Sequence, residues 1–165
     1  MRLHGADWND ALDMAWEKGE SVAFTCAYAG NLRNIAKTLR QLEEISGSSK
    51  IEIAHEMEDL LAGSVELYED AARKQALLAG YAKKCEHNIS GDTIVVRLDE
   101  IVRNLREKAD WMMKNIRANE WVKDGEDGWF NGYYDNHGRK VEGVMDESVR
   151  MMLTGQVFAI MSGTA

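Results

Sequence analysis

Apolar residues recur at helical spacing over long stretches of the chain, which predicts a mainly α-helical protein. The first stretch predicts a helix over 21–46, because its apolar residues follow one another at intervals of three and four and so form one stripe. The members of this stripe are Tyr28, Leu32, Ile35, Leu39 and Leu42. Ser21 is a suitable N-cap residue and Gly47 a suitable C-terminal stop, so both ends of the helix are marked in the sequence.

Two further stretches predict helices over 51–84 and 92–118. The stripe of the former begins with Ile53, Met57, Leu60 and Leu61, and Gly63 weakens its middle, so this stretch is either one bent helix or two. The stretch 92–118 has the most regular pattern in the chain, again alternating steps of three and four. Its stripe consists of Val95, Leu98, Val102, Leu105, Ala109, Met112 and Ile116.

The pattern changes after Glu120, where glycine, asparagine, aspartate and aromatic residues become frequent over 121–144. Aromatic residues from Trp129 onward, then an Asp-Asn-His-Gly turn, then Arg-Lys-Val predict a β-hairpin near residues 128–144. Helical spacing returns over 146–162, which predicts a terminal helix.

Composition narrows the classes of partner. The 165 residues suit one domain, and a net charge of −8 without a basic block argues against binding to nucleic acid. No apolar run approaches the roughly 18 residues of a membrane span, and the first twenty residues lack a signal-peptide core. We therefore expect no membrane partner and a cytoplasmic location.

The two cysteines give no sign of a metal site. Cys26 and Cys85 stand far apart without a Cys-x-x-Cys motif, so we expect no metal site and read both as small buried residues.

The segment before the first predicted helix carries the candidate chemistry. Asp7 and Asp10 flank a tryptophan and an asparagine there. A tryptophan face stacks on a sugar ring, an asparagine amide pairs with hydroxyl groups, and a carboxylic acid can protonate a glycosidic oxygen. The same residues also suit an ordinary turn beside a tryptophan that covers the core. Composition alone leaves both interpretations open.

Three segments together resemble one enzyme family. The string ADWNDALDM…GESVAF resembles the DWND…GESV segment of the inverting glycoside phosphorylases, the cellobiose, chitobiose and β-glucan phosphorylases of glycoside hydrolase family 94. Residues 127–141, DGWFNGYYDNHGRKV, resemble the family's DGEWFLRAYDDNG element. Residues 155–163, GQVFAIMSG, resemble its PQSWAVLSG helix. The three segments occur in the family's order and span the chain almost from end to end.

The resemblance implies a fold, a chemistry and a set of site residues. The fold is a segment of an (α/α)6 six-hairpin barrel with an inserted β-hairpin, and residues 1–20 form its catalytic loop. Asp10 is the general acid, Trp8 lines the sugar subsite, and Asp7 and Glu20 are substrate-binding residues. Two alternatives stay open: Asp7 as an acceptor that fixes the loop, and Glu20 as a first-turn acid that caps the helix.

The resemblance also implies the co-substrate. An inverting hydrolase needs a second carboxylate to activate water, whereas an inverting phosphorylase uses inorganic phosphate as the nucleophile and needs no other cofactor and no metal. The acid must stay protonated near neutral pH, which requires burial or a neighbouring negative charge such as Asp7 or the phosphate itself. The organic substrate is an oligosaccharide or a β-glucan.

The resemblance covers only part of the family's barrel. Family members are far longer, and their earlier barrel helices and later phosphate-binding segments have no counterpart in residues 1–165. We therefore expect little or no activity from the chain alone, and association through its apolar stripes with the rest of a barrel or with further copies. The alternatives are a related barrel hydrolase, the phosphorylase domain of a cyclic-glucan synthase, or a non-catalytic helical interaction module.

Overall fold

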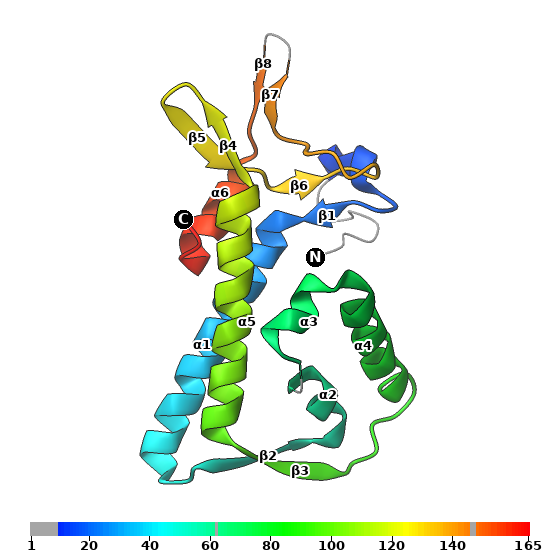
Figure 1. The fold of residues 1–165 in the computed structure, drawn as a ribbon, viewed down its shortest axis with the longest axis vertical. Helices are drawn as coiled ribbons and strands as arrows, with labels where there is room; N and C mark the ends of the chain where they lie inside the picture. The colour runs from blue at the N-terminus through cyan, green and yellow to red at the C-terminus, as the bar shows by residue number, and fades with distance from the viewer. Residues whose placement is uncertain (1–9, 62, 146–147) are drawn as a thin grey trace. The chain divides into compact units, whose positions relative to one another are not determined.

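The computed structural model describes residues 10–61, 63–145 and 148–165 (Figure 1). These residues divide into two compact units, one formed by the residues up to Asn31 together with Ala109–Ala165, the other by Leu32–Lys108. The described ranges contain six α-helices, two short 3-10 helices and four two-stranded antiparallel sheets. Helices hold far more residues than strands, so the chain is mainly helical, with more β-structure than the single predicted hairpin.

Helix α1 spans Val22–Ser46, within one residue of the range predicted for the first helix. The Oγ atom of Ser21 accepts a hydrogen bond from the Phe24 N–H at 2.9 Å, so this serine caps the N-terminus. Gly47 adopts a φ of +69° and its N–H donates to the Glu43 carbonyl at 2.9 Å, which ends the helix.

The buried face of α1 differs from the predicted stripe. Tyr28, Ile35 and Leu42 are exposed, whereas the buried side chains are smaller and repeat at similar intervals: Val22, Ala23, Cys26, Ala29, Leu32 and Ala36. Of the predicted stripe, Leu32 is buried and Leu39 is half-buried, so the prediction is wrong for its other three members. Periodicity cannot choose between two stripes of equal spacing, and small residues on the buried face allow neighbouring backbone to approach closely. A Cβ on Gly30, for example, would lie 3.0 Å from the Cβ of Ser162.

The unit Leu32–Lys108 contains two strands where helices were predicted. Strand β2 (Lys50–Ala54) pairs antiparallel with β3 (Thr93–Arg97), with Ile53 opposite Ile94. The predicted helices over 51–84 and 92–118 are therefore wrong over their first residues. Alternating isoleucines in β2 and four consecutive β-branched residues in β3 favour strands, and this preference outweighs the helical spacing.

Helical structure resumes after both strands. The 3-10 helix η2 (His55–Met57) leads into α2 (Glu58–Leu61), α3 (Val65–Glu69) and α4 (Ala71–Lys84), and β3 leads into α5 (Leu98–Asn119). Two side chains of α5 satisfy carbonyls at the end of α2: Asn104 Nδ2 donates to Leu61 at 2.8 Å, and Lys108 Nζ donates to Leu60. Burial lowers the pKa of the Lys108 ammonium to about 8.

The other unit pairs a strand that precedes α1 with a strand that follows α5. The 3-10 helix η1 (Asp10–Ala15) precedes strand β1 (Glu20–Ser21), which pairs antiparallel with β6 (Tyr133–Tyr134). Figure 1 shows β1 and β6 side by side. Two hairpins, β4 (Trp121–Asp124) with β5 (Asp127–Phe130) and β7 (Gly143–Met145) with β8 (Ser148–Arg150), precede helix α6 (Leu153–Ser162).

These strands correct two predictions. In place of the full hairpin predicted near 128–144, the two sides of the turn pair only through a bridge between Tyr134 and Lys140 and the adjacent backbone bond from Val141 to Tyr133, while the other edge of β6 pairs with β1. The terminal helix predicted over 146–162 begins at Leu153, because strand β8 occupies the preceding residues. In the first case the strand partner, β1, is distant in sequence. In the second, the local pattern did not reveal the β7–β8 hairpin.

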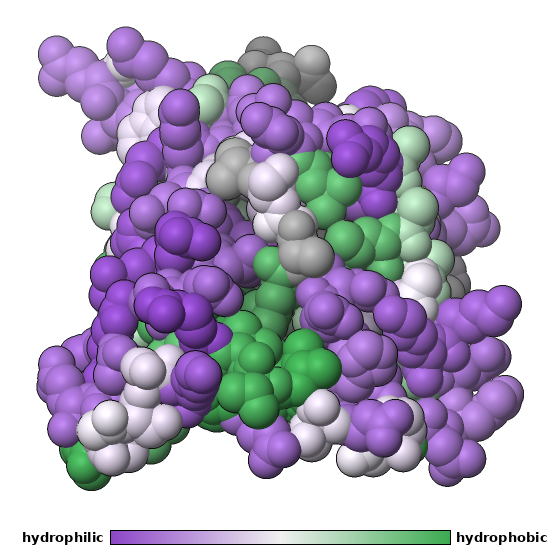
Figure 2. Space-filling model, turned by 60° about the horizontal axis from the view of Figure 1, so that its bottom comes forward, coloured by the Kyte–Doolittle hydropathy of each residue, from purple (hydrophilic) through white to green (hydrophobic). Residues whose placement is uncertain are grey.

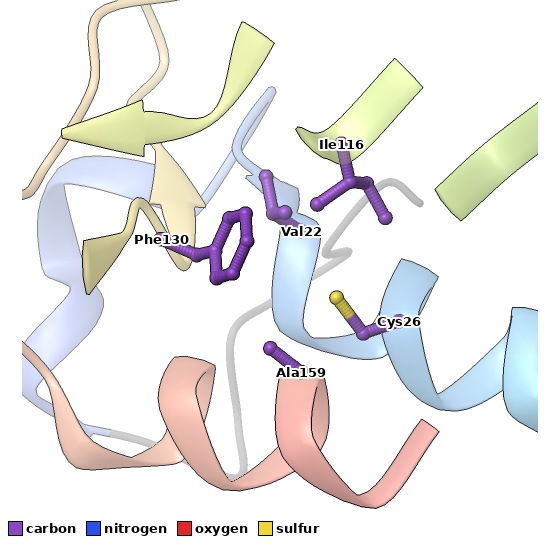
Figure 3. Close-up of a cluster of buried hydrophobic side chains, with 5 residues drawn as sticks. All are labelled: Val22, Cys26, Ile116, Phe130 and Ala159. Carbon is purple, nitrogen blue, oxygen red and sulfur yellow. The ribbon is translucent and has the colours of Figure 1, made fainter. Parts of the chain in front are cut away.

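The core of this unit joins α1, α5, β5 and α6. Figure 3 shows its main cluster, in which Val22, Cys26, Ile116, Phe130 and Ala159 converge from these elements. Cys26 is buried, as its sequence context predicts, and burial raises the pKa of its thiol. A second cluster consists of Ala15, Ala23, Tyr133 and Val141.

Apolar side chains also reach the surface. Figure 2 shows green, apolar patches among hydrophilic residues on the face it presents. On α6 an exposed stripe at spacings of four, three and one consists of Leu153, Val157, Ile160 and Met161. Within the described ranges, none of the helices is both long and apolar enough to span a bilayer.

Candidate active site

The predicted site residues fall at the start of the chain. Asp7 and Trp8 lie outside the described residues. Asp10 is the first residue of η1, and the structure describes its backbone but not its side chain. Glu20 is described and lies in β1. The structure therefore shows which contacts hold residues 14–23, the part of the chain that follows the predicted acid.

Glu20 is exposed and pairs with Tyr134 across the β1–β6 ladder. Helix α1 begins two residues later, contains no acidic residue in its first turn, and is capped by the Ser21 hydroxyl. The interpretation of Glu20 as a helix-capping acid is therefore wrong. Its carboxylate makes no hydrogen bond or ion pair with another described residue, and the substrate-binding role that the resemblance implies stays a prediction.

Asn136 makes hydrogen bonds to the backbone of the segment between η1 and β1. Its Oδ1 atom accepts hydrogen bonds from the backbone N–H groups of Glu17 at 2.9 Å and Lys18 at 2.7 Å. Its own backbone N–H donates to the Met14 carbonyl at 2.8 Å. One residue therefore makes three hydrogen bonds to residues 14–18, across more than a hundred positions of sequence.

Asp135 builds the turn that presents Asn136. Its Oδ1 atom accepts from the N–H groups of His137 at 2.8 Å and Arg139 at 2.9 Å, and its Oδ2 atom accepts from Arg139 Nε at 2.8 Å. The backbone bonds and the guanidinium of Arg139 lower the pKa of this carboxyl to about 2. Asp135 is therefore ionised at neutral pH and serves the turn as an acceptor.

Gly132 connects three elements of the unit. Its carbonyl accepts from the N–H groups of Val22 at 2.8 Å and Ala23 at 3.1 Å, at the start of α1. Its own N–H donates to Glu142 Oε1 at 2.7 Å, while Glu142 Oε2 accepts from the N–H of Met152, the N-cap residue of α6, at 2.9 Å. Glu142 is only 2% exposed, and burial raises the pKa of its carboxyl.

Gln156 joins α6 to β5. Its side-chain amide pairs with both backbone groups of Phe130: Oε1 accepts from the N–H at 3.0 Å, and Nε2 donates to the carbonyl at 2.7 Å. The sequence assigns no role to Gln156, although it lies in the third of the resembling segments. Its observed role is to bind that segment to the second one.

The carboxylate of Glu120, directly after α5, makes hydrogen bonds and an ion pair with three side chains. The Tyr134 hydroxyl lies 2.9 and 2.8 Å from its two carboxylate oxygens, Asn131 Nδ2 donates to it at 3.2 Å, and Lys140 Nζ lies 3.7 Å away. Burial and the adjacent carboxylate raise the pKa of Tyr134, so its phenol stays protonated and acts as a donor. This network fixes β6, the strand that pairs with Glu20.

A hollow of about 330 Å³ lies beside the Asp135 turn. Its lining consists of Met14, Asp135, Arg139, Lys140, Val141, Met145 and Arg150. Arg139 pairs with Asp135 and Lys140 with Glu120, whereas Arg150 makes no hydrogen bond or ion pair with any described residue. The hollow can therefore offer a guanidinium to a polar or anionic group. Among the described residues, no group of three or more His, Cys, Asp or Glu side chains could hold a metal ion.

No protein-family model matches the chain, and no curated protein sequence matches it. The contacts that Asn136 and Gly132 make with residues 14–23, and the bonds from Glu142 that hold Gly132, were not anticipated from the sequence. The Asp-Asn-His-Gly turn was recognised, and an asparagine within it was the one local signal available. Its hydrogen-bond partners depend on tertiary structure.

Proposed function

We propose that the chain is part of the (α/α)6 catalytic barrel of an inverting glycoside phosphorylase. One observation carries the proposal: the three segments that resemble this family are bonded to one another in a single unit. The second segment holds the first through Asn136 and Gly132, and Gln156 holds the third against the second. This convergence supports the proposal, because the resemblance assigns all three segments to one catalytic domain.

In the proposed reaction Asp10 is the general acid. Its proton passes to the glycosidic oxygen as the bond between that oxygen and the anomeric carbon breaks. An oxygen of inorganic phosphate attacks the anomeric carbon from the opposite face and forms the new bond. The products are a sugar 1-phosphate of inverted configuration and a sugar shortened by one unit, and no second catalytic carboxylate is needed.

The remaining site residues would act on the substrate. Trp8 would stack on the sugar whose bond is broken, and Asp7 would accept from its hydroxyls or from the loop. Glu20, whose carboxylate is exposed next to β6, would accept hydrogen bonds from the acceptor sugar. The organic substrate would be a β-linked oligosaccharide or glucan.

The test compares the 165-residue chain alone with the complete barrel protein of which the proposal makes it a part. Both are incubated with β-linked gluco-oligosaccharides, with and without inorganic phosphate, and sugar 1-phosphate is followed by ³¹P NMR. We expect phosphate-dependent product from the complete protein, little or none from the chain alone, and loss of turnover in Asp10→Asn.

Two results would overturn the proposal. Turnover that persists in Asp10→Asn would show that another group supplies the proton. Release of free sugar without any need for phosphate would assign the barrel to the hydrolases instead. An Asp124→Asn variant, which changes an exposed aspartate of β4 outside the three resembling segments, is the matched control and should keep most of its activity.

A further inference from the structure

The turn that contains Asn136 lies against the segment that follows Asp10 in the chain. Helix η1 extends from Asp10 to Ala15, and residues 16–19 connect it to β1. This connection contains no strand or α-helix, so its position depends on the groups that bind its backbone.

Two side-chain bonds from Asn136 fix this connection. The Oδ1 atom accepts from the N–H groups of Glu17 and Lys18 at 2.9 and 2.7 Å, which uses both lone pairs of the amide oxygen. The backbone N–H of Asn136 reaches the Met14 carbonyl inside η1 at 2.8 Å. Asn136 thus adds three hydrogen bonds to a segment that is also held by the bond from the Gly19 N–H to the Ala15 carbonyl at 2.9 Å and by the packing of Ala15 in the buried cluster.

Asn136 is itself held rigidly. The Asp135 carboxylate accepts from the backbone on the far side of the turn, and the Gly138 N–H donates to the Asp135 carbonyl at 3.1 Å. Gly138 adopts a φ of +73°, a conformation that favours glycine. A support of this kind behind a polar side chain is what precise placement of a reacting group requires.

We propose that Asn136 is a positioning residue for the general acid, acting through the backbone of residues 14–18. This inference rests on the proposed function, since it takes Asp10 as the acid. Asn136 need not touch the substrate. It sets where η1 lies, and a general acid must lie within hydrogen-bond reach of the glycosidic oxygen to transfer its proton.

The experiment uses three variants of the complete protein. Asn136→Ala removes the amide oxygen, and Asn136→Asp keeps an acceptor at the same position. Asn88→Ala is the matched control, because Asn88 is exposed and makes no hydrogen bond to any described residue. Each variant is assayed for kcat and KM in phosphorolysis, and hydrogen exchange is measured over residues 16–19.

We expect Asn136→Ala to lower kcat by about 10- to 100-fold, because small misplacements of a reacting group cost up to about that factor. KM should change less than threefold, and exchange of the Glu17 and Lys18 amides should rise about tenfold as their acceptor is lost. Asn136→Asp should recover most of kcat and of the protection. Asn88→Ala should match the wild type in every measurement.

The outcomes separate this inference from the proposed function. Normal kcat in Asn136→Ala, or unchanged exchange at residues 17 and 18, would overturn the positioning role while leaving phosphorolysis intact. An equal fall of kcat in Asn136→Ala and Asn136→Asp would overturn it too, because the acceptor would then be irrelevant. If Asp10→Asn keeps its turnover, the proposed function fails, and the positioning role fails with it.

Discussion

Replacing Glu142 by alanine should destabilise the fold more than almost any other single exchange in this unit. The carboxylate is 2% exposed and accepts two backbone N–H groups, one from Gly132 and one from Met152. No other acceptor for either N–H is found among the described residues. Leaving a buried donor unpaired costs about 1–3 kcal/mol, so two orphaned donors cost about 2–6 kcal/mol. This is a large part of the roughly 5–15 kcal/mol that stabilises a typical domain.

Glu142→Gln should lie between the wild type and Glu142→Ala. A glutamine amide offers one acceptor oxygen, and its NH₂ group would face the second N–H donor. We therefore expect a loss of about 1–3 kcal/mol, since one donor remains unpaired. Glu126→Ala, at an exposed position between β4 and β5, is the control and should change stability by less than about 0.5 kcal/mol.

The assay is urea unfolding followed by the fluorescence of the chain's tryptophans, which include the buried Trp129. A loss below about 1 kcal/mol in Glu142→Ala, or a glutamine variant less stable than the alanine variant, would refute the reasoning.

The pH dependence of stability gives a second check. Burial raises the folded-state pKa of Glu142 above its value of 4.5 in the unfolded chain. Wild-type stability relative to Glu142→Gln should therefore be greatest below pH 4.5 and fall as the pH rises through the folded-state pKa.

Changes at four other positions test separate parts of the structure. A Cβ on Gly132 would lie 2.6 Å from Glu142 Oε1, so Gly132→Ala should lower the stability by about 1–3 kcal/mol in thermal unfolding. Gly80→Ala, inside α4 with open space around it, should instead raise it by about 0.5–1 kcal/mol. Ser21→Ala removes the N-cap of α1 and should cost about 1 kcal/mol. Burial lowers the pKa of Lys108 to about 8, so wild-type stability should rise between pH 8 and 10.5, and a Lys108→Met variant should lack this rise.

The sequence predicted the elements whose signals are local. Both ends of α1 follow from Ser21 and Gly47, which act within one turn of the helix. The body of α5 follows from a regular stripe in which Leu98, Val102 and Ile116 are all buried. The buried face of α1 could not be predicted in this way, because its sequence contains two stripes of equal spacing and only the neighbours decide which one is covered.

Strands and site contacts depended on distant partners. β2 and β3 stabilise each other across about forty residues, and each is short enough to be read as the start of the helix that follows it. In the candidate site the sequence marked Glu20 and the Asp-Asn-His-Gly turn. It could not indicate that Asn136 would reach the backbone of residues 17 and 18, since that contact exists only once the strands β1 and β6 have paired.

The bonds from Asn136 have a consequence for biosynthesis. The acceptor for the Glu17 N–H is made 119 residues after its donor. At roughly 5–20 residues per second, a ribosome needs about 6–24 s to make that interval. Throughout this time the segment after η1 lacks the partners that hold it. Nascent chains should therefore be cleaved by proteases near residues 16–19 until the turn at 135–139 has been synthesised, and become resistant there afterwards.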